Sequence, residues 1–202
     1  MGTRLILVRH GQIPANVNQL WHGSTDDALT ERGLEQAQRV AAYLARAHPR
    51  VAAVYTSPAQ RARSTASPIA AALGVPLIEA PGLAEYAIGV LEGTSFADLS
   101  NQHRFFEQAD ADLAWAPPQG ESLGAVAARV VDTWQQIARN HRDAEVVVVS
   151  HGAAIAIGLT MLLHGEPRGW ARYTARNASV SEIVLAEPSA QLVSLNIIEH
   201  LE

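Results

Sequence analysis

The stretch LILVRHG, residues 5–11, indicates the fold together with a later counterpart, VVVVSHG, at residues 146–152. Each stretch begins with four consecutive apolar residues rather than an apolar–polar alternation, which is typical of a strand covered by helices on both faces. Strands of this kind usually lie in parallel sheets. Each stretch also ends in His-Gly. The sequence therefore predicts two buried strands of a parallel sheet that end in the same way.

Helical and strand patterns alternate after the first stretch. Apolar positions recur on one helical face from Thr30, a good N-cap, to about residue 47. They are Leu34, Ala37, Val40, Ala41 and Leu44. A second strand is predicted at 51–55 and a short third strand at about 76–78.

Three further helices are predicted. The first begins at Ser57-Pro58 and should end near Gly74, and Pro68 inside it is expected to kink or break it. A long helix is predicted from the shared apolar face of residues 123–137. The helix at 153–163 is apolar nearly all round, so we expect it to be internal.

The remaining segments complete a layered α/β arrangement. Residues 82–120 are loop-rich with short helical pieces, and we expect them to form an insertion over the sheet. The closing strands, 180–186 and 192–198, are predicted to pair as a hairpin across Pro188-Ser189-Ala190. Alternating strands and helices predict an α/β fold with a mainly parallel sheet. Because no repeat or linker interrupts the chain, we expect residues 1–202 to form a single domain.

Composition excludes several classes of protein. The 202 residues include 15 basic and 20 acidic ones, a net charge of −5, so no overall field attracts nucleic acid or an anionic membrane. With no cysteine, disulfides and thiolate chemistry are excluded. All basic residues are arginines, which excludes a Schiff-base lysine and a P-loop lysine. No signal pattern or membrane-length apolar stretch is present, and we expect a cytoplasmic protein.

The chemistry is expected where the two buried strands end. Ligands of an open parallel sheet bind beyond the carboxyl ends of its strands, so His10 and His151 should point toward the ligand. Gly11 and Gly152 let backbone N–H groups approach an anion closely. One histidine after a strand is more often structural, but two such endings in one chain favour function.

Arg61 is a third candidate for the site. It falls in the first turn of the predicted helix, where a cation opposes the helix dipole unless an anion accompanies it. That anion suggests a phosphate. The alternative, that the side chain is solvated, stays open for Arg61 and is favoured for Arg63.

Taken in order along the chain, these residues resemble the histidine phosphatase superfamily, which also holds cofactor-dependent phosphoglycerate mutases. The resemblance rests on Arg9-His10-Gly11, Asn16, Gly23, Asp26, Leu29-Thr30, Ser57-Pro58, Arg61-Ala62, Thr65-Ala66, Leu83, Glu85, Gly89, Glu92-Gly93, Gly120-Glu121-Ser122 and Ser150-His151-Gly152. Any one of these matches is weak, but the ordered set covers most of the chain and is specific.

The resemblance implies a three-layer α/β/α sandwich of the phosphoglycerate mutase-like kind and a site for phosphoryl transfer. It implies that His10 is the nucleophile, forming a phosphohistidine, and that Glu85 is the general acid. Arg9 and Arg61 would grip the phosphoryl oxygens with His151 as a further donor, without metal or cofactor. The expected substrate-binding residues are Gly11, Asn16, Trp21, His22, Gly23, Tyr86 and Gly152.

Departures from the mutase pattern favour hydrolysis of a small phosphomonoester. Mutases of the family carry an arginine where this chain has Tyr86, and another where it has Leu20. Between residues 84 and 120 the basic residues are His103 and Arg104. A substrate with a carboxylate and a second phosphate would therefore find few partners, and unpaired charges are costly to bury.

All three phenylalanines, Phe96, Phe105 and Phe106, lie in the insertion, with Trp115 nearby. Two interpretations stay open for this cluster. The favoured one is that the rings dock the insertion onto the core. The other is that they form an apolar wall that selects a carbon-rich leaving group.

Other functions stay open as alternatives. They are a phosphoglycerate mutase, an inactive phospho-ligand binding protein of the same fold, and a metallohydrolase that uses His10 and His151 as ligands. Against the last, no clustered ligand spacing is present. A serine hydrolase lacks its Gly-x-Ser-x-Gly motif. The closing strands offer an edge on which a homodimer is possible.

Overall fold

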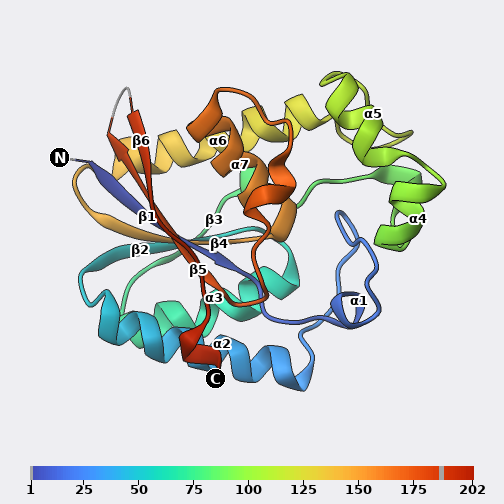
Figure 1. The fold of residues 1–202 in the computed structure, drawn as a ribbon. Helices are drawn as coiled ribbons and strands as arrows, with labels where there is room; N and C mark the ends of the chain where they lie inside the picture. The colour runs from blue at the N-terminus through green and yellow to red at the C-terminus, as the bar shows by residue number, and fades with distance from the viewer. Residues whose placement is uncertain (1, 187–188) are drawn as a thin grey trace.

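The computed structural model of the protein describes residues 2–186 and 189–202. Within them the chain forms a six-stranded sheet in the order β3-β2-β4-β1-β5-β6 (Figure 1). The strands are β1 (Thr3–Arg9), β2 (Val51–Thr56), β3 (Leu77–Glu79), β4 (Glu145–Ser150), β5 (Val180–Ala186) and β6 (Ser189–Ile197). Strands β3, β2, β4 and β1 pair in parallel, and β5 and β6 are antiparallel to their neighbours. The α/β fold with a mainly parallel sheet is confirmed.

Helices cover both faces of this sheet (Figure 1). The long helices are α2 (Glu31–Ala47), α3 (Gln60–Leu73), α6 (Leu123–Asn140) and α7 (Gly152–His164). Alternate residues of β1 point to opposite faces: Leu5 and Leu7 join the core under α6 and α7, whereas Ile6 and Val8 join the core over α2 and α3. This two-sided burial explains why the strand sequences are continuously apolar.

Short helices gather at the end of the sheet where β1 ends (Figure 1). They are α1 (Pro14–Val17), α4 (Phe96–Asn101) and α5 (Phe105–Ala111), with the 3₁₀ turns η1 (Pro81–Leu83), η2 (Gly89–Leu91), η3 (Trp170–Tyr173) and η4 (Glu199–Leu201) elsewhere in the chain. In the part of the chain that the structure describes, no helix has the length and apolar character to cross a membrane.

The position of the site follows from the topology. Strands β1 and β4 are parallel neighbours with Arg9 opposite Ser150, so the residues that follow them, His10 and His151, leave the sheet side by side. The chain continues from β1 into α2 on one face, and from β4 into α7 on the other face. A crevice forms where successive connections leave a sheet to opposite faces, and ligands bind there.

Three details differ from the prediction. Helix α3 continues through Pro68 to Leu73. The proline leaves the carbonyl of Ser64 without its helical partner, but Ser64 and Pro68 are only half-buried, so solvent can reach that carbonyl. Leu34 is 53% exposed, and Gly33 takes its place on the buried face of α2. In the C-terminal hairpin, Ser189 already belongs to β6, whereas Pro188 lies outside the described residues.

Candidate active site

His10 is held with one ring nitrogen free. Its Nδ1 lies 2.8 Å from the carbonyl oxygen of Gly11, and because a carbonyl only accepts, Nδ1 carries the proton. Nε2 is therefore the nitrogen with a lone pair, and the ring lines a cavity. Burial, followed by the positive charges of Arg9 and Arg61, lowers the pKa of His10 well below its ordinary value of 6.5. A neutral imidazole at this position can act as a nucleophile.

The loop after β1 is fixed by an asparagine that the sequence did not single out. Asn177 Nδ2 donates to the carbonyl oxygen of His10 at 3.0 Å and to Asn16 Oδ1 at 2.9 Å. Asn16 Oδ1 also accepts from the backbone N–H of Ile13. With its oxygen occupied, Asn16 presents its amino group as a donor at the cavity wall.

Arg9 keeps donors available at the cavity. Its Nη1 donates to the carbonyl oxygen of Ala175 at 2.7 Å. Its Nε is buried and has no hydrogen-bond partner among the described residues. Burial lowers the pKa of Arg9, and Arg61 adds to this effect while Glu85 opposes it. A half-buried guanidinium with an unsatisfied donor suits an anionic ligand, because the ligand would supply the missing acceptor.

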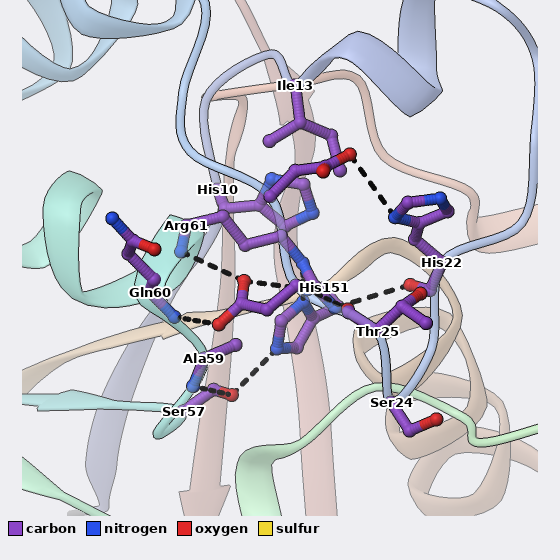
Figure 2. A network of polar contacts seen from close by, with 12 residues as sticks. His10, Ile13, His22, Ser24, Thr25, Ser57, Ala59, Gln60, Arg61 and His151 are labelled. Atoms are coloured by element: carbon purple, nitrogen blue, oxygen red, sulfur yellow. Dashed lines mark hydrogen bonds and ion pairs between the residues drawn. The ribbon is translucent and has the colours of Figure 1, made fainter.

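His151 has both ring nitrogens engaged, unlike His10. Its Nε2 lies 2.7 Å from Ser57 Oγ, and its Nδ1 accepts from Arg61 Nε at 3.2 Å (Figure 2). Since Nδ1 accepts, the proton is on Nε2, which donates to the serine hydroxyl. Burial, then the nearby charges with Arg61 first, lowers the pKa of His151 well below 6.5. The two imidazole centroids are 5.2 Å apart.

Arg61 is 1% exposed and donates every one of its five N–H groups to acceptors of the protein. The acceptors are His151 Nδ1, the carbonyl oxygens of His22, Gly23 and Thr25, and Asp26 Oδ1, at 2.7 to 3.2 Å. Arg61 thus ties the 22–26 loop to His151 (Figure 2).

The anion that accompanies Arg61 in the first turn of α3 is a carboxylate of the protein itself. Asp26 pairs with the Arg61 guanidinium and also accepts from the backbone N–H of Gln60. This contact caps α3 from a distant loop. Ser57, predicted as the cap, lies before the helix start instead, and its hydroxyl is used by His151 and by the backbone N–H of Ala59.

Glu85 lies against the beginning of α7. Its carboxylate accepts from the backbone N–H groups of Tyr86, Ala153 and Ala154 at 2.9 to 3.1 Å, and it lines the same cavity as His10. These bonds hold the carboxylate at the first turn of α7, whose backbone N–H groups have no partner within the helix.

Arg129 supports Glu85 from behind, and no local signal in the sequence marks this role. It donates to the carbonyl oxygens of Ala84 and Glu85 at 2.7 and 2.9 Å. It also forms a two-pronged ion pair with Glu121, at 2.7 and 2.8 Å. Glu121 in turn accepts from the backbone N–H of Ala87. The segment that carries Glu85 is therefore fixed by a partly buried ion pair between Arg129 on α6 and Glu121, which precedes that helix.

The cavity has a volume of about 240 Å³. Its wall is formed by Arg9, His10, Ile13, Asn16, Leu20, Trp21, His22, Glu85, Phe96, Phe106, Gly152, Ala153, Trp170, Ala171 and Thr174. Seven of the predicted site residues are among them. The sequence missed Trp170 and Thr174, which lie about 20 residues beyond His151 in a segment without a recognisable motif.

Five predicted residues do not reach the wall. Arg61 and His151 lie behind it, as described above. The backbone of Gly11 packs so closely on Gly33 that a Cβ would lie 2.5 Å from that carbonyl oxygen. The N–H of Gly23 donates to Glu92 at 2.7 Å. Tyr86 is fully buried against Trp21 and Phe105, with rings 6.0 and 5.4 Å apart.

Within residues 2–186 and 189–202, no group of three or more histidine or acidic side chains is placed to hold a metal ion. His10 and His151 lie close together, but their surroundings are arginines, a serine and backbone carbonyls. This donor set does not match the ligands of a catalytic zinc.

Fold and site together define the class of protein: an α/β protein with two histidines and two arginines at the carboxyl ends of parallel strands, suited to binding a phosphoryl group. Residues 5–198 match the histidine phosphatase superfamily, branch 1. The chain belongs to this family, and it is an enzyme of the phosphoglycerate mutase-like superfamily of phosphatases.

Relatives of known name include phosphatases and mutases. The metal-independent phosphoserine phosphatase of Arabidopsis thaliana is 31% identical over 206 residues, which cover 98% of this chain and 83% of that protein. A 2,3-bisphosphoglycerate-dependent phosphoglycerate mutase of Bartonella quintana is 34% identical over 172 residues, covering 82% and 83%. A crystal structure of phosphoserine phosphatase from Entamoeba histolytica with 3-phosphoglyceric acid superposes with a TM-score of 0.87 at 27% identity, covering 99% and 100%.

Proposed function

We propose that this protein hydrolyses small phosphomonoesters through a phosphohistidine on His10. The observation that carries the proposal is the His10 ring, whose Nδ1 is fixed by a carbonyl while Nε2 is left as a nucleophile beside the cavity. In the first step the Nε2–phosphorus bond forms and the ester phosphorus–oxygen bond breaks. The departing oxygen takes a proton from the carboxyl group of Glu85.

In the second step water attacks phosphorus, its proton returns to Glu85, and the Nε2–phosphorus bond breaks to release inorganic phosphate. Glu85 lines the same cavity as His10, which supports its assignment as acid and then base. Its hydrogen bonds to α7 keep it in place across both steps.

Arg9 and Asn16 are assigned to grip the phosphoryl oxygens, since both keep free donors at the wall. Arg61 contributes its positive charge, which disfavours protonation of His10, and it orients His151. Direct contact between Arg61 and a phosphoryl oxygen requires it to give up one of its present acceptors, because all five N–H groups are used.

Hydrolysis is favoured over the mutase reaction, in which the phosphoryl group on His10 would be returned to the substrate. Tyr86, at a position where mutases carry an arginine, is fully buried in the aromatic core and leaves no cation there. Leu20, at the other such position, lines the cavity with an apolar side chain. We also propose that segment 82–120 acts as the roof of this one site within a single domain.

The experiment that tests the proposal is isolation of the intermediate. The protein is mixed with p-nitrophenyl phosphate, quenched in alkaline detergent, and digested for mass spectrometry. We expect an acid-labile, alkali-stable phosphate on the His10 peptide, absent from His10→Ala. Turnover that continues in His10→Ala would overturn the proposal. Turnover that EDTA abolishes and zinc restores would overturn it in favour of the metallohydrolase alternative. Phosphate binding without turnover would indicate the inactive binding protein.

A further inference from the structure

The outer part of the cavity is apolar. Six side chains form this outer wall: Ile13, Leu20, Trp21, Phe96, Phe106 and Trp170. Their aromatic rings contact one another around Trp21, with centroids 5.5 Å away at Phe96, 6.2 Å at Phe106 and 6.2 Å at Trp170. Such offset and edge-on contacts make a rigid aromatic surface. The outer wall comes from three separate parts of the chain, so it is a built feature of the fold.

The phenylalanines of the roof divide into two roles. Phe105 is fully buried and packs on Tyr86 and Trp115, at 5.4 and 5.8 Å, which anchors the roof to the core. Phe96 and Phe106 line the cavity instead, and Phe96 is 45% exposed. A large aromatic residue left half-exposed at the rim of a pocket is typical of a ligand contact.

Few charged groups line the cavity. Of the side chains that line the cavity, the ionisable ones are Arg9, His10, His22 and Glu85. Arg9, His10 and Glu85 are assigned to the phosphoryl group, and His22 lies 3.3 Å from Asp27. Arg104, the arginine of the roof, is exposed and paired with Glu107 outside the cavity. A second anionic group on the substrate would therefore enter the outer wall without a cation to meet it.

From this distribution, and resting on the proposed function, we infer that the substrate is a phosphomonoester whose leaving group is apolar or aromatic and carries no second negative charge. The cavity volume of about 240 Å³ is below the ~300–1,000 Å³ of sites for drug-sized ligands. It fits the phosphoryl group with one ring-sized substituent. This chain thus differs in substrate class from relatives named for phosphoserine, whose leaving group carries a carboxylate.

The test compares alkyl phosphates whose leaving alkoxides are similar in basicity, so that differences report contacts with the leaving group. We expect kcat/KM for 2-phenylethyl phosphate to exceed that for glycerol 3-phosphate, O-phosphoserine and 3-phosphoglycerate by roughly tenfold or more, the effect of burying one aromatic group. Equal rates, or preference for phosphoserine or 3-phosphoglycerate, would overturn the inference while leaving the proposed function intact. Failure to hydrolyse any ester of the panel would overturn the proposed function itself.

Variants locate the preference on the outer wall. Phe106→Ala and Trp170→Ala should each lower kcat/KM for 2-phenylethyl phosphate about tenfold and change that for glycerol 3-phosphate about twofold or less. The matched control is Trp115→Phe, a roof aromatic that packs on Phe105 and does not line the cavity, and it should retain the preference. Leu20→Arg should raise kcat/KM for 3-phosphoglycerate. A preference that survives both alanine variants would contradict the assignment to this wall.

Discussion

His10 and His151 follow adjacent parallel strands, are followed by glycine, and are both buried, yet their ring nitrogens are used differently. The Nδ1–H of His10 donates to the carbonyl oxygen of Gly11, which leaves Nε2 beside the cavity without a partner among the described residues. Both ring nitrogens of His151 form hydrogen bonds within the protein, Nε2 with Ser57 and Nδ1 with Arg61. Two similar stretches of sequence thus give one histidine that is free to react and one that is fixed in place.

The difference arises from what lies beside each strand end. The β2–α3 connection brings Ser57, and the first turn of α3 brings Arg61, against His151, because β2 is the other parallel neighbour of β4. Beside the end of β1, the segment that precedes β5 carries Asn177. Its side chain bonds to the backbone of His10 and to Asn16 but not to the imidazole. Sheet order, rather than the local motif, therefore determines which partners the two imidazole rings meet.

The largest expected effect separates these two roles directly. His10→Ala should lower kcat for p-nitrophenyl phosphate at least ~10⁴-fold, because it removes the proposed nucleophile. His151→Ala should lower kcat by roughly 10²-fold, because it removes the ring that orients Arg61 and packs beside His10 but no group that bonds to phosphorus. Steady-state kinetics check both values, with circular dichroism as the control for folding. Comparable losses in the two variants would contradict the division of roles.

Glu85→Gln is expected to have the next largest effect, about 10²–10⁴-fold on kcat for an alkyl phosphate. The reason is that an alkoxide must be protonated as it leaves, whereas p-nitrophenolate leaves without help. The loss should therefore be much smaller for p-nitrophenyl phosphate. Comparing the two substrates with each variant measures this. Equal losses on both substrates would indicate that Glu85 only positions the α7 N-terminus.

Burial is the property that the two histidines share, and it predicts a dependence of stability on pH. Both pKa values are lowered in the folded protein, so the unfolded chain binds more protons below its histidine pKa of about 6.5. The free energy of unfolding should thus fall as the pH is lowered from about 7 to 5. Urea unfolding at several pH values measures this slope.

His10→Gln and His151→Gln should each reduce that slope, because each removes one proton-binding group from the unfolded state. The matched control is His103→Gln, since His103 is exposed. A slope that His103→Gln reduces as much as the two buried variants would show that the acid sensitivity has another source.

The sequence predicted the histidine pair well because its signals are local. Continuous apolar runs mark buried parallel strands, and parallel strands that end in the same motif bring His10 and His151 to one edge. Arg9 and Glu85 were found through the family pattern, and the structure places both on the cavity wall beside His10. Their catalytic roles stay predictions.

What the sequence did not predict depends on single contacts between distant segments. Asn177 and Arg129 act through hydrogen bonds that span more than 40 residues, and no periodicity or spacing marks such partners. The unfavourable position of Arg61 in the first turn of its helix was recognised from the sequence. The anion that accompanies it in the structure is the carboxylate of Asp26, 35 residues away, whereas the sequence suggested a bound phosphate. An unsatisfied charge in a sequence indicates that a partner exists without saying where it lies.

Ser57→Ala tests the hydrogen bond that holds the His151 ring, and we expect a small change in rate. It removes the 2.7 Å partner of His151 Nε2 while the bond from Arg61 to Nδ1 remains, so the ring becomes more mobile without losing its position. We expect kcat to fall about tenfold or less and the free energy of unfolding to fall by ~1–3 kcal/mol, since a buried donor is left unsatisfied.

Ser179→Ala is the matched control, because Ser179 is equally buried and its hydroxyl has no hydrogen-bond partner among the described residues. Its removal should change kcat and stability less than Ser57→Ala does. Measuring both variants by kinetics and urea unfolding distinguishes loss of the His151 contact from loss of a buried hydroxyl. If Ser57→Ala matched the control, the bond from Arg61 alone would be sufficient to fix His151, and Ser57 would have no part in the difference between the two histidines.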